Sequence, residues 1–342
     1  MDGTGGRVKP RVAFAMGGDE VLSAVFSKEA RTRLDSVADV ISDRVLAEFS
    51  SDRSQQVLND VDALITGWGS PVITGSVLEL APRLRLIAHS AGTVKAHVER
   101  TCWDRGITVT TAAQANGIPV AQFTLAFILL AGKRTFDAAR ALHVDQASFV
   151  KEGLANDIGN NGSTVGIIGA SRIGRLVIEL LRPFGFTVLL ADPTVSDQEA
   201  LVLGVQLVSL DDLMAGSSVV SLHAPVLPST VGMIAAKQLA AMKDGSTFIN
   251  TARGALVDHD ALRREAATGR ISAVLDVTSP EPLRNGDPLY SMPNVILTPH
   301  IAGSMGNELK RMGDLAVTEI ERLAAGQPHE HVVSRQALDL MA

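Results

Sequence analysis

Residues 164–174 read Thr-Val-Gly-Ile-Ile-Gly-Ala-Ser-Arg-Ile-Gly, and this stretch decides the fold. The apolar run Val165–Ile168 is typical of a buried parallel strand, and the glycines after it lead into Leu176–Leu181, which is apolar at helical spacing. The sequence therefore predicts a strand, a tight turn and a helix. At such a turn a dinucleotide pyrophosphate approaches the backbone and lies at the positive end of the helix.

A second strand is predicted at Thr187–Ala191, and it ends at Asp192. An acidic side chain at this position accepts hydrogen bonds from the adenosine ribose hydroxyls. NAD is favoured over NADP, because a carboxylate repels a 2′-phosphate and residues 193–195 contain no Arg or Lys. Ser171 replaces the second glycine of a G-x-G-x-x-G pattern, and its hydroxyl either crowds the phosphates or donates to one of them. Taken alone, the stretch is also compatible with an α/β turn that binds no ligand.

The composition indicates a soluble globular protein with room for two domains. The chain has 342 residues, 46% of them hydrophobic and 20% charged, and a net charge of −6. This charge suggests neither nucleic acid nor an anionic membrane as a partner. The single cysteine, Cys102, excludes an internal disulfide and a cysteine-rich metal site, and no metal is expected. The lone cysteine fits a reducing compartment, so a cytoplasmic location is expected. Residues 1–6 lack the apolar core of a signal peptide and are expected to be disordered.

The first third of the chain alternates predicted strands and helices, which indicates a parallel sheet covered on both faces. The predicted strands are residues 11–16, 63–66, 84–88 and 107–110, and the predicted helices lie around residues 30–42, 77–80 and 94–102. Small residues after the third strand, at Ala91 and Gly92, allow backbone N–H groups to face outward and hold an anion. An ordinary turn is the alternative.

A long apolar helix is predicted over about residues 119–143. It is long enough to bridge two domains, and its apolar surface suggests contact with another subunit; full burial inside one domain is the alternative. Its longest apolar run, Phe123–Gly132, is too short to span a bilayer. Residues 145–163 are expected to form a connecting loop.

Beyond Asp192, polar clusters follow one predicted strand after another. The strands at residues 218–222, 247–250, 272–275 and 295–297 are followed by His223-Ala224-Pro225, Thr251-Ala252-Arg253-Gly254, Asp276 and Thr298-Pro299-His300. In a doubly wound sheet the carboxyl ends of the strands share one edge, so these residues converge on the cofactor crevice. This convergence is the main argument for an active site.

The residue types at this edge suit hydride transfer to a carbonyl. The planar donors of Arg253 suit a carboxylate, and histidine, here His300, is the side chain that normally exchanges protons near neutral pH. Glu281 follows in a proline-flanked loop, and a carboxylate beside an imidazole favours its protonated form and fixes the ring. Asp276 is placed to orient a nicotinamide carboxamide. Considered singly, these side chains are also compatible with a surface ion pair, a core histidine and a solvated carboxylate.

The chain resembles the D-isomer-specific 2-hydroxyacid dehydrogenases. The resemblance rests on an ordered set of motifs: Val165–Gly174 with Asp192, Leu222–Pro225 with Thr230, Asn250–Asp258, Leu275–Val277 with Glu281–Leu283, and Pro293–Gly303. It implies that Arg253 binds the 2-oxo acid and polarises its carbonyl, that His300 is the general acid/base, and that Glu281 pairs with His300. It also implies that backbone amides near Ala91 and Gly92 hold the substrate carboxylate.

The predicted cofactor contacts lie in these same motifs. They are Gly169, Ser171, Arg172, Ile173, Gly174, Asp192, His223, Ala224, Pro225, Thr230, Thr251, Ala252, Arg253, Asp276, His300 and Gly303. The resemblance implies two doubly wound parallel-sheet domains, a Rossmann NAD-binding domain at residues 116–304 inserted into a flavodoxin-like substrate domain at residues 1–115 and 305–342. Family members are usually homodimers built on the NAD domain.

The expected reaction is hydride transfer between NAD(H) and a small 2-oxo acid or D-2-hydroxy acid. Besides Ser171, the chain departs from the family at Gln122, where Glu is usual, and at Val94-Lys95, where Asp-Asn is common, so the substrate is left open. Two alternatives remain: an NAD-responsive binding protein similar to the C-terminal-binding-protein co-repressors, and a dehydrogenase of another small anion such as phosphite.

Overall fold

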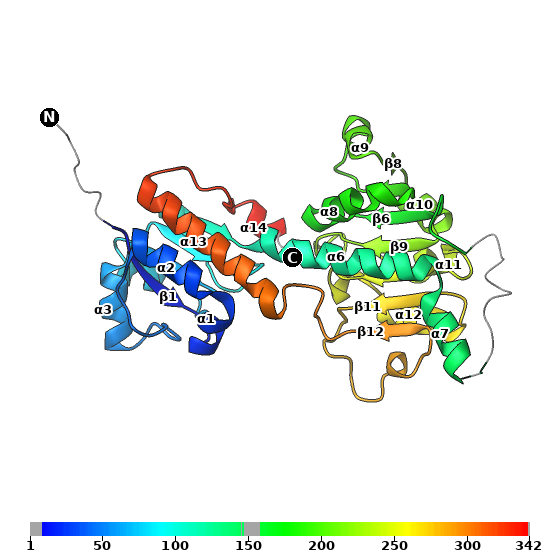
Figure 1. Ribbon diagram of the computed structural model, residues 1–342, viewed down its shortest axis with the longest axis horizontal. Helices are drawn as coiled ribbons and strands as arrows, with labels where there is room; N and C mark the ends of the chain where they lie inside the picture. Colours follow the sequence, from blue (N-terminus) through cyan, green and yellow to red (C-terminus); the bar gives the residue numbers. More distant parts are fainter. Residues whose placement is uncertain (1–8, 145, 147–157, 341–342) are drawn as a thin grey trace. The chain divides into compact units, whose positions relative to one another are not determined.

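The computed structural model describes residues 9–144, 146 and 158–340. These residues form two compact units, one within residues 1–116 and 304–341 and the other within residues 117–303 (Figure 1). The chain start at residues 1–6 and most of the predicted loop at residues 145–163 lie outside the described part.

The first unit contains a parallel sheet in the order β2-β1-β3-β4-β5, which is the flavodoxin-like order. Its strands are β1 (Arg11–Ala15), β2 (Asp39–Val40), β3 (Ala63–Thr66), β4 (Leu86–His89) and β5 (Thr108–Thr111). Its helices are α1 (Asp19–Val25), α2 (Lys28–Val37), α3 (Asp52–Asp60), α4 (Gly75–Leu80), α5 (Thr101–Asp104), α13 (Leu309–Ala325) and α14 (Ala337–Leu340), with the 3₁₀ turn η5 (Gly306–Glu308) before α13.

Helices cover both faces of this sheet, so both faces are buried. Successive side chains of a strand point in opposite directions and enter the two cores in turn. In β3, Ala63 and Ile65 pack into the core formed with α1, α2 and α13, whereas Leu64 packs into the core formed with α3, α4 and α5. All four residues of β3 are therefore buried, as the continuous apolar run predicts.

The second unit contains a parallel sheet in the order β12-β11-β10-β9-β6-β7-β8, the Rossmann order extended by one strand. Its strands are β6 (Thr164–Ile168), β7 (Thr187–Ala191), β8 (Gln206–Leu207), β9 (Val219–Leu222), β10 (Thr247–Asn250), β11 (Ser272–Leu275) and β12 (Val295–Leu297). Its helices are α6 (Ala113–Gly132, beginning in the first unit), α7 (Thr135–Val144), α8 (Arg172–Leu181), α9 (Asp197–Leu203), α10 (Leu210–Gly216), α11 (Ala236–Ala241) and α12 (His259–Ala267). Short 3₁₀ turns are η2 (Arg182–Phe184), η3 (Gly254–Leu256) and η4 (Pro288–Tyr290). The predicted fold class is confirmed.

Two helical layers cover this sheet. Val165 and Ile167 of β6 pack with apolar residues of α6, α8 and α9, while Ile168 belongs to the core formed with α10, α11 and α12. Figure 1 shows α6 lying across one face of the sheet. The strand order reverses between β6 and β9, and the carboxyl ends of these two strands are the place where such sheets bind their ligands.

Three of the predicted helices are wrong in extent. The helix predicted around residues 30–42 is α2, which ends at Val37, because Asp39 and Val40 pair with β1 as strand β2. Residues 94–100 form turns, and α5 begins only at Thr101, because the backbone groups of His97 and Glu99 pair with Ile73 instead of with a helix. The long helix predicted at residues 119–143 is two helices, α6 and α7. The break lies at Arg134, whose φ of 47° is left-handed and ends the regular helical path.

Helix α6 also corrects the expectation about bilayer length. It has 20 residues, and among the described residues it alone is long and apolar enough to cross a membrane by length and composition. It begins before the apolar run that the sequence singled out. In the structure its residues Ala121, Ile128 and Ala131 pack on the second sheet, as in the core helix of a globular unit.

Candidate active site

The turn after β6 needs glycine at two positions. Gly169 has a φ of 93°, and a Cβ there would lie 2.7 Å from the backbone N of Ala224. A Cβ on Gly174 would lie 2.1 Å from the carbonyl oxygen of Gly169. The two glycines therefore let β6, the turn and α8 pack closely, and the first N–H groups of α8 belong to Arg172, Ile173 and Gly174.

Ser171 caps helix α8. Its Oγ accepts a hydrogen bond from the N–H of Gly174 at 3.3 Å, so the serine that replaces glycine caps the amino end of the helix. The hydroxyl hydrogen remains available as a donor in the turn.

Asp192 follows β7 and contacts the same turn. Its Oδ2 accepts the N–H of Ala170 at 2.7 Å, and its Oδ1 accepts the N–H and the hydroxyl of Thr194 at 2.8 and 2.6 Å. Burial opposes ionisation, but these hydrogen bonds and the Arg175 charge outweigh it and hold the pKa of Asp192 below its usual value. The carboxylate is thus charged and fixed beside the glycine turn.

The segment after β9 lies against the glycine turn. The N–H of His223 donates to the carbonyl of Ile168 at 2.7 Å, and its Nε2 lies 2.8 Å from Oγ of Ser221. Burial lowers the pKa of His223 to about 3, so the ring is neutral at physiological pH. Ala224 is buried, and the hydroxyl of Thr230 donates to the carbonyl of Pro225 at 2.6 Å, which closes the following loop.

The turn after β10 carries Arg253. Buried Asn250 accepts the N–H of Ala252 and donates to the carbonyl of Arg253, both at 3.0 Å. Oγ1 of Thr251 lies 3.0 Å from Oγ1 of Thr124, which ties the turn to α6. Burial lowers the pKa of Arg253, while the charge of Glu281 acts in the opposite direction. An arginine remains protonated under such a shift, so the turn presents a fixed positive charge.

Asp276 holds the loop that carries His300. Its Oδ1 accepts the hydroxyl of Thr298 at 2.7 Å and the N–H of Ile301 at 2.8 Å, and its Oδ2 accepts the N–H of Ala302 at 3.0 Å. His300 itself has a left-handed φ of 57°, which this loop maintains. The nicotinamide contact expected of Asp276 stays a prediction, as does that of Gly303, the last residue of the second unit.

His300 and Glu281 form a direct pair. Nδ1 of His300 lies 2.5 Å from Oε1 of Glu281, and the two side chains are 47% and 41% exposed. Because Nδ1 is engaged by the carboxylate, Nε2 is the nitrogen left to exchange a proton with another group. The structure therefore brings Arg253, Glu281 and His300 together in one unit, as expected from the strand ends.

Ala91 and Gly92 lie in the first unit, after β4. The hydroxyl of Thr111 lies 2.9 Å from the carbonyl oxygen of Ala91 and 2.5 Å from that of Gly92. In a planar trans peptide the N–H points opposite to the carbonyl. The N–H groups of Gly92 and Thr93, which share peptides with these two carbonyls, therefore face away from Thr111. This is the orientation that an anion-binding turn requires.

His259 lies beside the site and was not predicted from the sequence, whereas Gly254 belongs to the cluster expected after the strand at residues 247–250. A Cβ on Gly254 would lie 2.0 Å from the backbone carbon of Thr278, and Nε2 of His259 accepts the N–H of Ser279 at 3.3 Å. Both therefore contact the segment that leads to Glu281. His259 directly follows the motif Asn250–Asp258, and this position is the one signal in the sequence that could have pointed to it.

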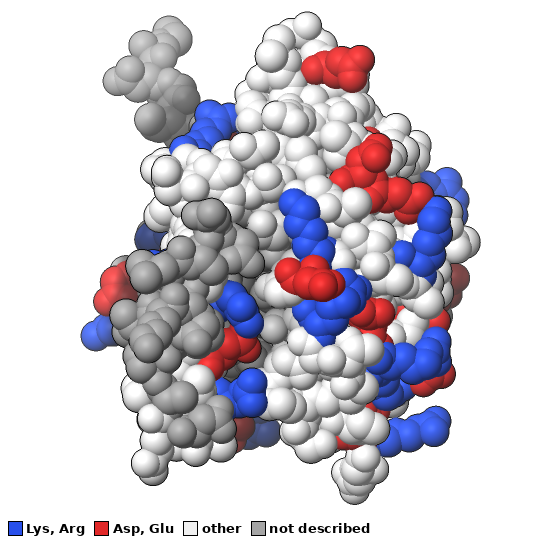
Figure 2. All heavy atoms as spheres, turned by 90° about the vertical axis from the view of Figure 1, so that its right-hand side faces the viewer, with Lys and Arg blue, Asp and Glu red and all other residues white. Residues whose placement is uncertain are grey.

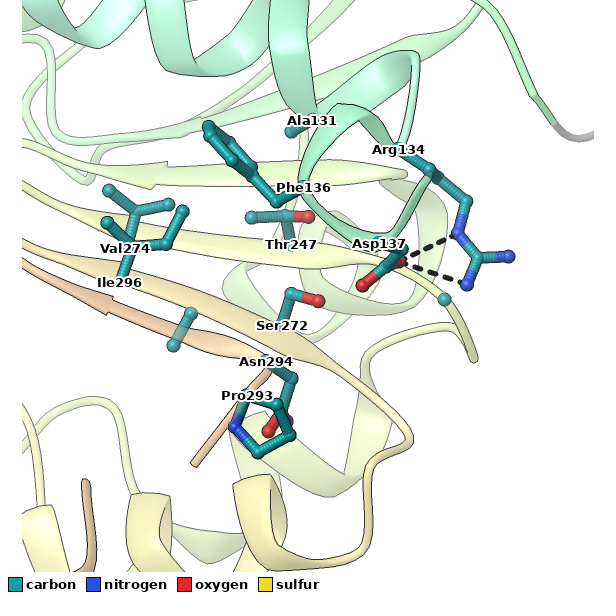
Figure 3. A pocket seen from close by; sticks show the side chains of 12 residues that line it. Ala131, Arg134, Phe136, Asp137, Thr247, Ser272, Val274, Pro293, Asn294 and Ile296 are labelled. Atoms are coloured by element: carbon teal, nitrogen blue, oxygen red, sulfur yellow. Dashed lines mark hydrogen bonds and ion pairs between the residues drawn. The ribbon is translucent and has the colours of Figure 1, made fainter. Parts of the chain in front are cut away.

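Figure 3 shows a pocket in the second unit that none of these residues lines. It is found at the amino ends of β10, β11 and β12, next to α7, where Arg134 pairs with Asp137 at 3.0 Å. Its lining includes Phe136, Thr247 and Asn294. Since ligands of parallel sheets bind at the carboxyl ends, this pocket is not the candidate active site.

Residues 125–302 match the family model described as D-isomer specific 2-hydroxyacid dehydrogenase, NAD binding domain. The matched residues form most of the second unit, and NAD is its cofactor. The glycine turn, the N-terminus of α8 and the fixed carboxylate of Asp192 fit this dinucleotide.

Relatives of known name agree with this match. The chain is 31% identical over 293 residues to the glyoxylate reductase of Korarchaeum cryptofilum, which is 82% of this chain and 85% of that protein. It is 32% identical over 268 residues to the D-3-phosphoglycerate dehydrogenase of Archaeoglobus fulgidus, which is 78% of this chain and 50% of that protein. The chain thus spans about half the length of the D-3-phosphoglycerate dehydrogenases that it matches.

A comparison of the fold with solved structures agrees with these relatives. A phosphoglycerate oxidoreductase from Rhizobium etli superposes with a TM-score of 0.81 at 26% sequence identity, covering 95% of this chain and 98% of that chain. From its sequence and its fold, the chain belongs to the D-isomer specific 2-hydroxyacid dehydrogenase family.

Proposed function

We propose that the protein is an NAD-dependent oxidoreductase that interconverts a small 2-oxo acid and its D-2-hydroxy acid. The observation that carries the proposal is the 2.5 Å contact between His300 and Glu281, made at the carboxyl edge of an NAD-binding sheet that also presents Arg253. NADH, when bound, supplies the hydride.

His300 is the proposed general acid. With Nδ1 bonded to Glu281, its Nε2 gives a proton to the carbonyl oxygen as that oxygen gains negative charge. Glu281 stabilises the protonated imidazole and fixes the orientation of the ring. In the reverse direction the same nitrogen takes the hydroxyl proton.

Arg253 is proposed to bind the substrate. Its guanidinium offers paired N–H donors to a carboxylate and can polarise the neighbouring carbonyl. The buried amide of Asn250 holds the backbone on both sides of this residue, so the guanidinium starts from a fixed position. Removing Arg253 should therefore affect substrate binding and turnover together.

The first unit is proposed to be the substrate domain. The turn at Ala91 and Gly92, fixed by Thr111, would bind the substrate carboxylate through backbone N–H groups. The names of the relatives, glyoxylate reductase and D-3-phosphoglycerate dehydrogenase, favour a small 2-oxo acid. The predicted cofactor contacts, from Gly169 to Gly303, are proposed to lie along NAD in the second unit.

A homodimer through the second unit is also proposed. Helices α6 and α7 expose Leu130, Phe136, Leu142 and Val144, with Leu142 at 61% and Val144 at 71% exposure. Exposed apolar residues gathered on neighbouring helices are typical of a subunit interface. Sedimentation of the purified protein tests this: a mass twice that of the chain supports the dimer, and a single-chain mass contradicts it.

Neither nucleic acid nor a membrane is proposed as a partner, and the cytoplasm is the proposed location. Figure 2 shows basic and acidic side chains interspersed over the displayed face of the second unit, which does not favour a polyanion. Cys102 is a buried free thiol, as suits a reducing compartment.

The binding-protein alternative and the phosphite alternative are not favoured, because the matched relatives are named as 2-hydroxyacid-type dehydrogenases and reductases. Oxidation of NADH, followed by its near-ultraviolet absorbance, tests the proposal. The panel is glyoxylate, hydroxypyruvate, pyruvate, 2-oxobutyrate, 2-oxoisocaproate and phenylpyruvate, with the Arg253→Ala variant as control. Turnover that the variant loses supports the dehydrogenase. Tight NADH binding without turnover on any acid supports a binding protein instead.

A further inference from the structure

The loop that carries Glu281 has few backbone attachment points. Of residues 279–282, Pro280 and Pro282 lack an N–H, so Ser279 and Glu281 alone can donate backbone hydrogen bonds. The hydroxyl of Thr278 donates to the carbonyl of Pro280 at 2.8 Å, which is a contact within the loop. A contact from outside is needed to fix the position of the loop.

His259, the first residue of α12, supplies such a contact. Its Nε2 accepts the N–H of Ser279 at 3.3 Å, and its Nδ1 lies 3.1 Å from the carbonyl oxygen of Val257. A carbonyl can only accept, so Nδ1 carries the proton and Nε2 presents its lone pair to Ser279. The two contacts thus require one tautomer of a neutral ring.

The surroundings keep the ring neutral and in place. Its side chain is buried, with 7% of the residue exposed, and burial lowers the pKa of His259 although the Val257 carbonyl opposes this. The charged groups around it are Arg263, Asp287 and Asp258. Asp258 also caps α12, accepting the N–H groups of Asp260 and Ala261 at 2.9 and 3.0 Å, so the start of the helix is fixed.

Gly254 holds the other side of the same peptide. A Cβ there would lie 2.0 Å from the backbone carbon of Thr278 and 2.6 Å from the N of Ser279, so this peptide packs directly on the Gly254 backbone. The short segment 253–259 therefore carries Arg253 and also contacts the Glu281 loop, through Gly254 and His259.

We propose that His259 is a positioning residue for Glu281: by accepting the Ser279 N–H it sets the distance from Glu281 to His300. The inference rests on the proposed function, since it assigns His259 to the same acid/base pair. It does not touch the reacting atoms, and its effect passes through Ser279 and the loop.

Two variants of His259 separate the acceptor from the rest of the ring. His259→Asn keeps an amide donor near Val257 but is too short to reach Ser279, whereas His259→Gln places a carbonyl oxygen near the position of Nε2. Ala266→Gly, a buried change in the same helix, is the control for a general loss of stability in α12.

Turnover is the first measurement. We expect His259→Asn to lower kcat about tenfold or more with little change in the KM for NADH, because a misplaced acid/base pair slows the chemical step. His259→Gln and Ala266→Gly should stay within about threefold of the unmodified protein. Equal kcat values in His259→Asn and Ala266→Gly would overturn the inference.

The second measurement needs no turnover. The ¹⁵N shifts of the neutral His300 imidazole report which nitrogen carries the proton. Bonding to Glu281 favours the Nδ1–H tautomer. We expect His259→Asn to lose this preference, as Glu281→Ala should because it removes the acceptor, while His259→Gln retains it. If the unmodified protein reduces none of the acids, the proposed function fails. The ¹⁵N shifts then test by themselves whether His259 positions Glu281 against His300. An unchanged His300 tautomer in His259→Asn would then refute its positioning role.

Discussion

The backbone N–H of Ala170 donates to Oδ2 of Asp192 at 2.7 Å, so the carboxylate predicted to select the cofactor is also part of the glycine turn. Its other oxygen is held by Thr194. The side chain proposed to accept hydrogen bonds from the ribose hydroxyls is thus held in place before NAD binds, which reduces the entropic cost of binding.

Replacing Asp192 by Ala should weaken NADH binding about tenfold or more. A hydrogen bond to a charged group contributes about 1.5–3 kcal/mol, and about 1.4 kcal/mol corresponds to a factor of ten. NADPH should be affected less, because the variant also removes the repulsion between Asp192 and the 2′-phosphate. Fluorescence titration with both cofactors measures the two effects.

Asp197→Ala, an exposed change at the start of α9, is the matched control and should leave both affinities unchanged. Tighter binding of NADPH than of NADH by the unmodified protein would show that the ribose assignment is wrong.

Ser171 gives a second prediction, because its Oγ caps α8 by accepting the N–H of Gly174. Ser171→Ala should destabilise the second unit by about 1 kcal/mol, whereas Ser171→Gly should cost only a few tenths. We also expect the glycine variant to bind NADH less tightly by about 0.5–1.5 kcal/mol, since it loses a hydroxyl donor at the phosphates. Thermal denaturation and NADH titration check these values. Tighter binding by Ser171→Gly would mean that the hydroxyl crowds the phosphates.

The sequence was sufficient for the fold class because buried parallel strands leave a local signal. The runs Val165–Ile168 and Thr187–Ala191 are apolar without alternation, and each coincides with a strand covered on both faces. The NAD cofactor followed from the turn between them. Residues 94–100 were wrongly predicted as helix, because what decides their path is pairing with Ile73, a contact that local periodicity does not record.

The same limit applies to the candidate site: local patterns predicted its residues but not the contacts that shape its loops. Arg253, Glu281 and His300 were placed from strand ends and motifs, which are local patterns. The hydrogen bonds that shape their loops, from Ile301 and Ala302 to Asp276 and from Ser279 to His259, join a side chain to a distant backbone group. Such contacts have no fixed spacing in the sequence, so the structure was needed to find them.

His300→Ala should abolish most turnover and leave NADH binding nearly intact. General acid/base catalysis contributes about 10²–10⁴-fold, and this is the expected loss in kcat. The loop should keep its shape, because Asp276 holds it through Thr298, Ile301 and Ala302 rather than through the imidazole. Stopped-flow reduction of the best acid and NADH titration measure the two quantities.

His143→Ala, at an exposed histidine of α7, is the control and should behave like the unmodified protein. If His300→Ala instead lost NADH binding with its turnover intact at saturating cofactor, the residue would serve cofactor binding alone and would not be the acid.

The buried histidines predict how stability depends on pH. Burial, with a smaller contribution from neighbouring His97, lowers the pKa of His89 in the first unit to about 3, and burial alone lowers that of His223 in the second unit to about 3. In the unfolded chain both return to about 6.5. The unfolded state therefore binds more protons between these values, and stability falls as the pH falls from about 6.5 toward 3, by about 1.4 kcal/mol per pH unit for each histidine.

Tryptophan fluorescence can follow this effect in the first unit. The chain has two tryptophans, Trp68 and Trp103, and both lie there. We expect urea unfolding followed by this signal to lose stability between pH about 6.5 and 5, where most carboxylates are still ionised. His89→Gln should make that dependence shallower, because the variant takes up no proton on unfolding, whereas His223→Gln should leave this signal unchanged. An equal pH dependence in the His89→Gln variant and the unmodified protein would show that His89 is not the buried group that must gain a proton.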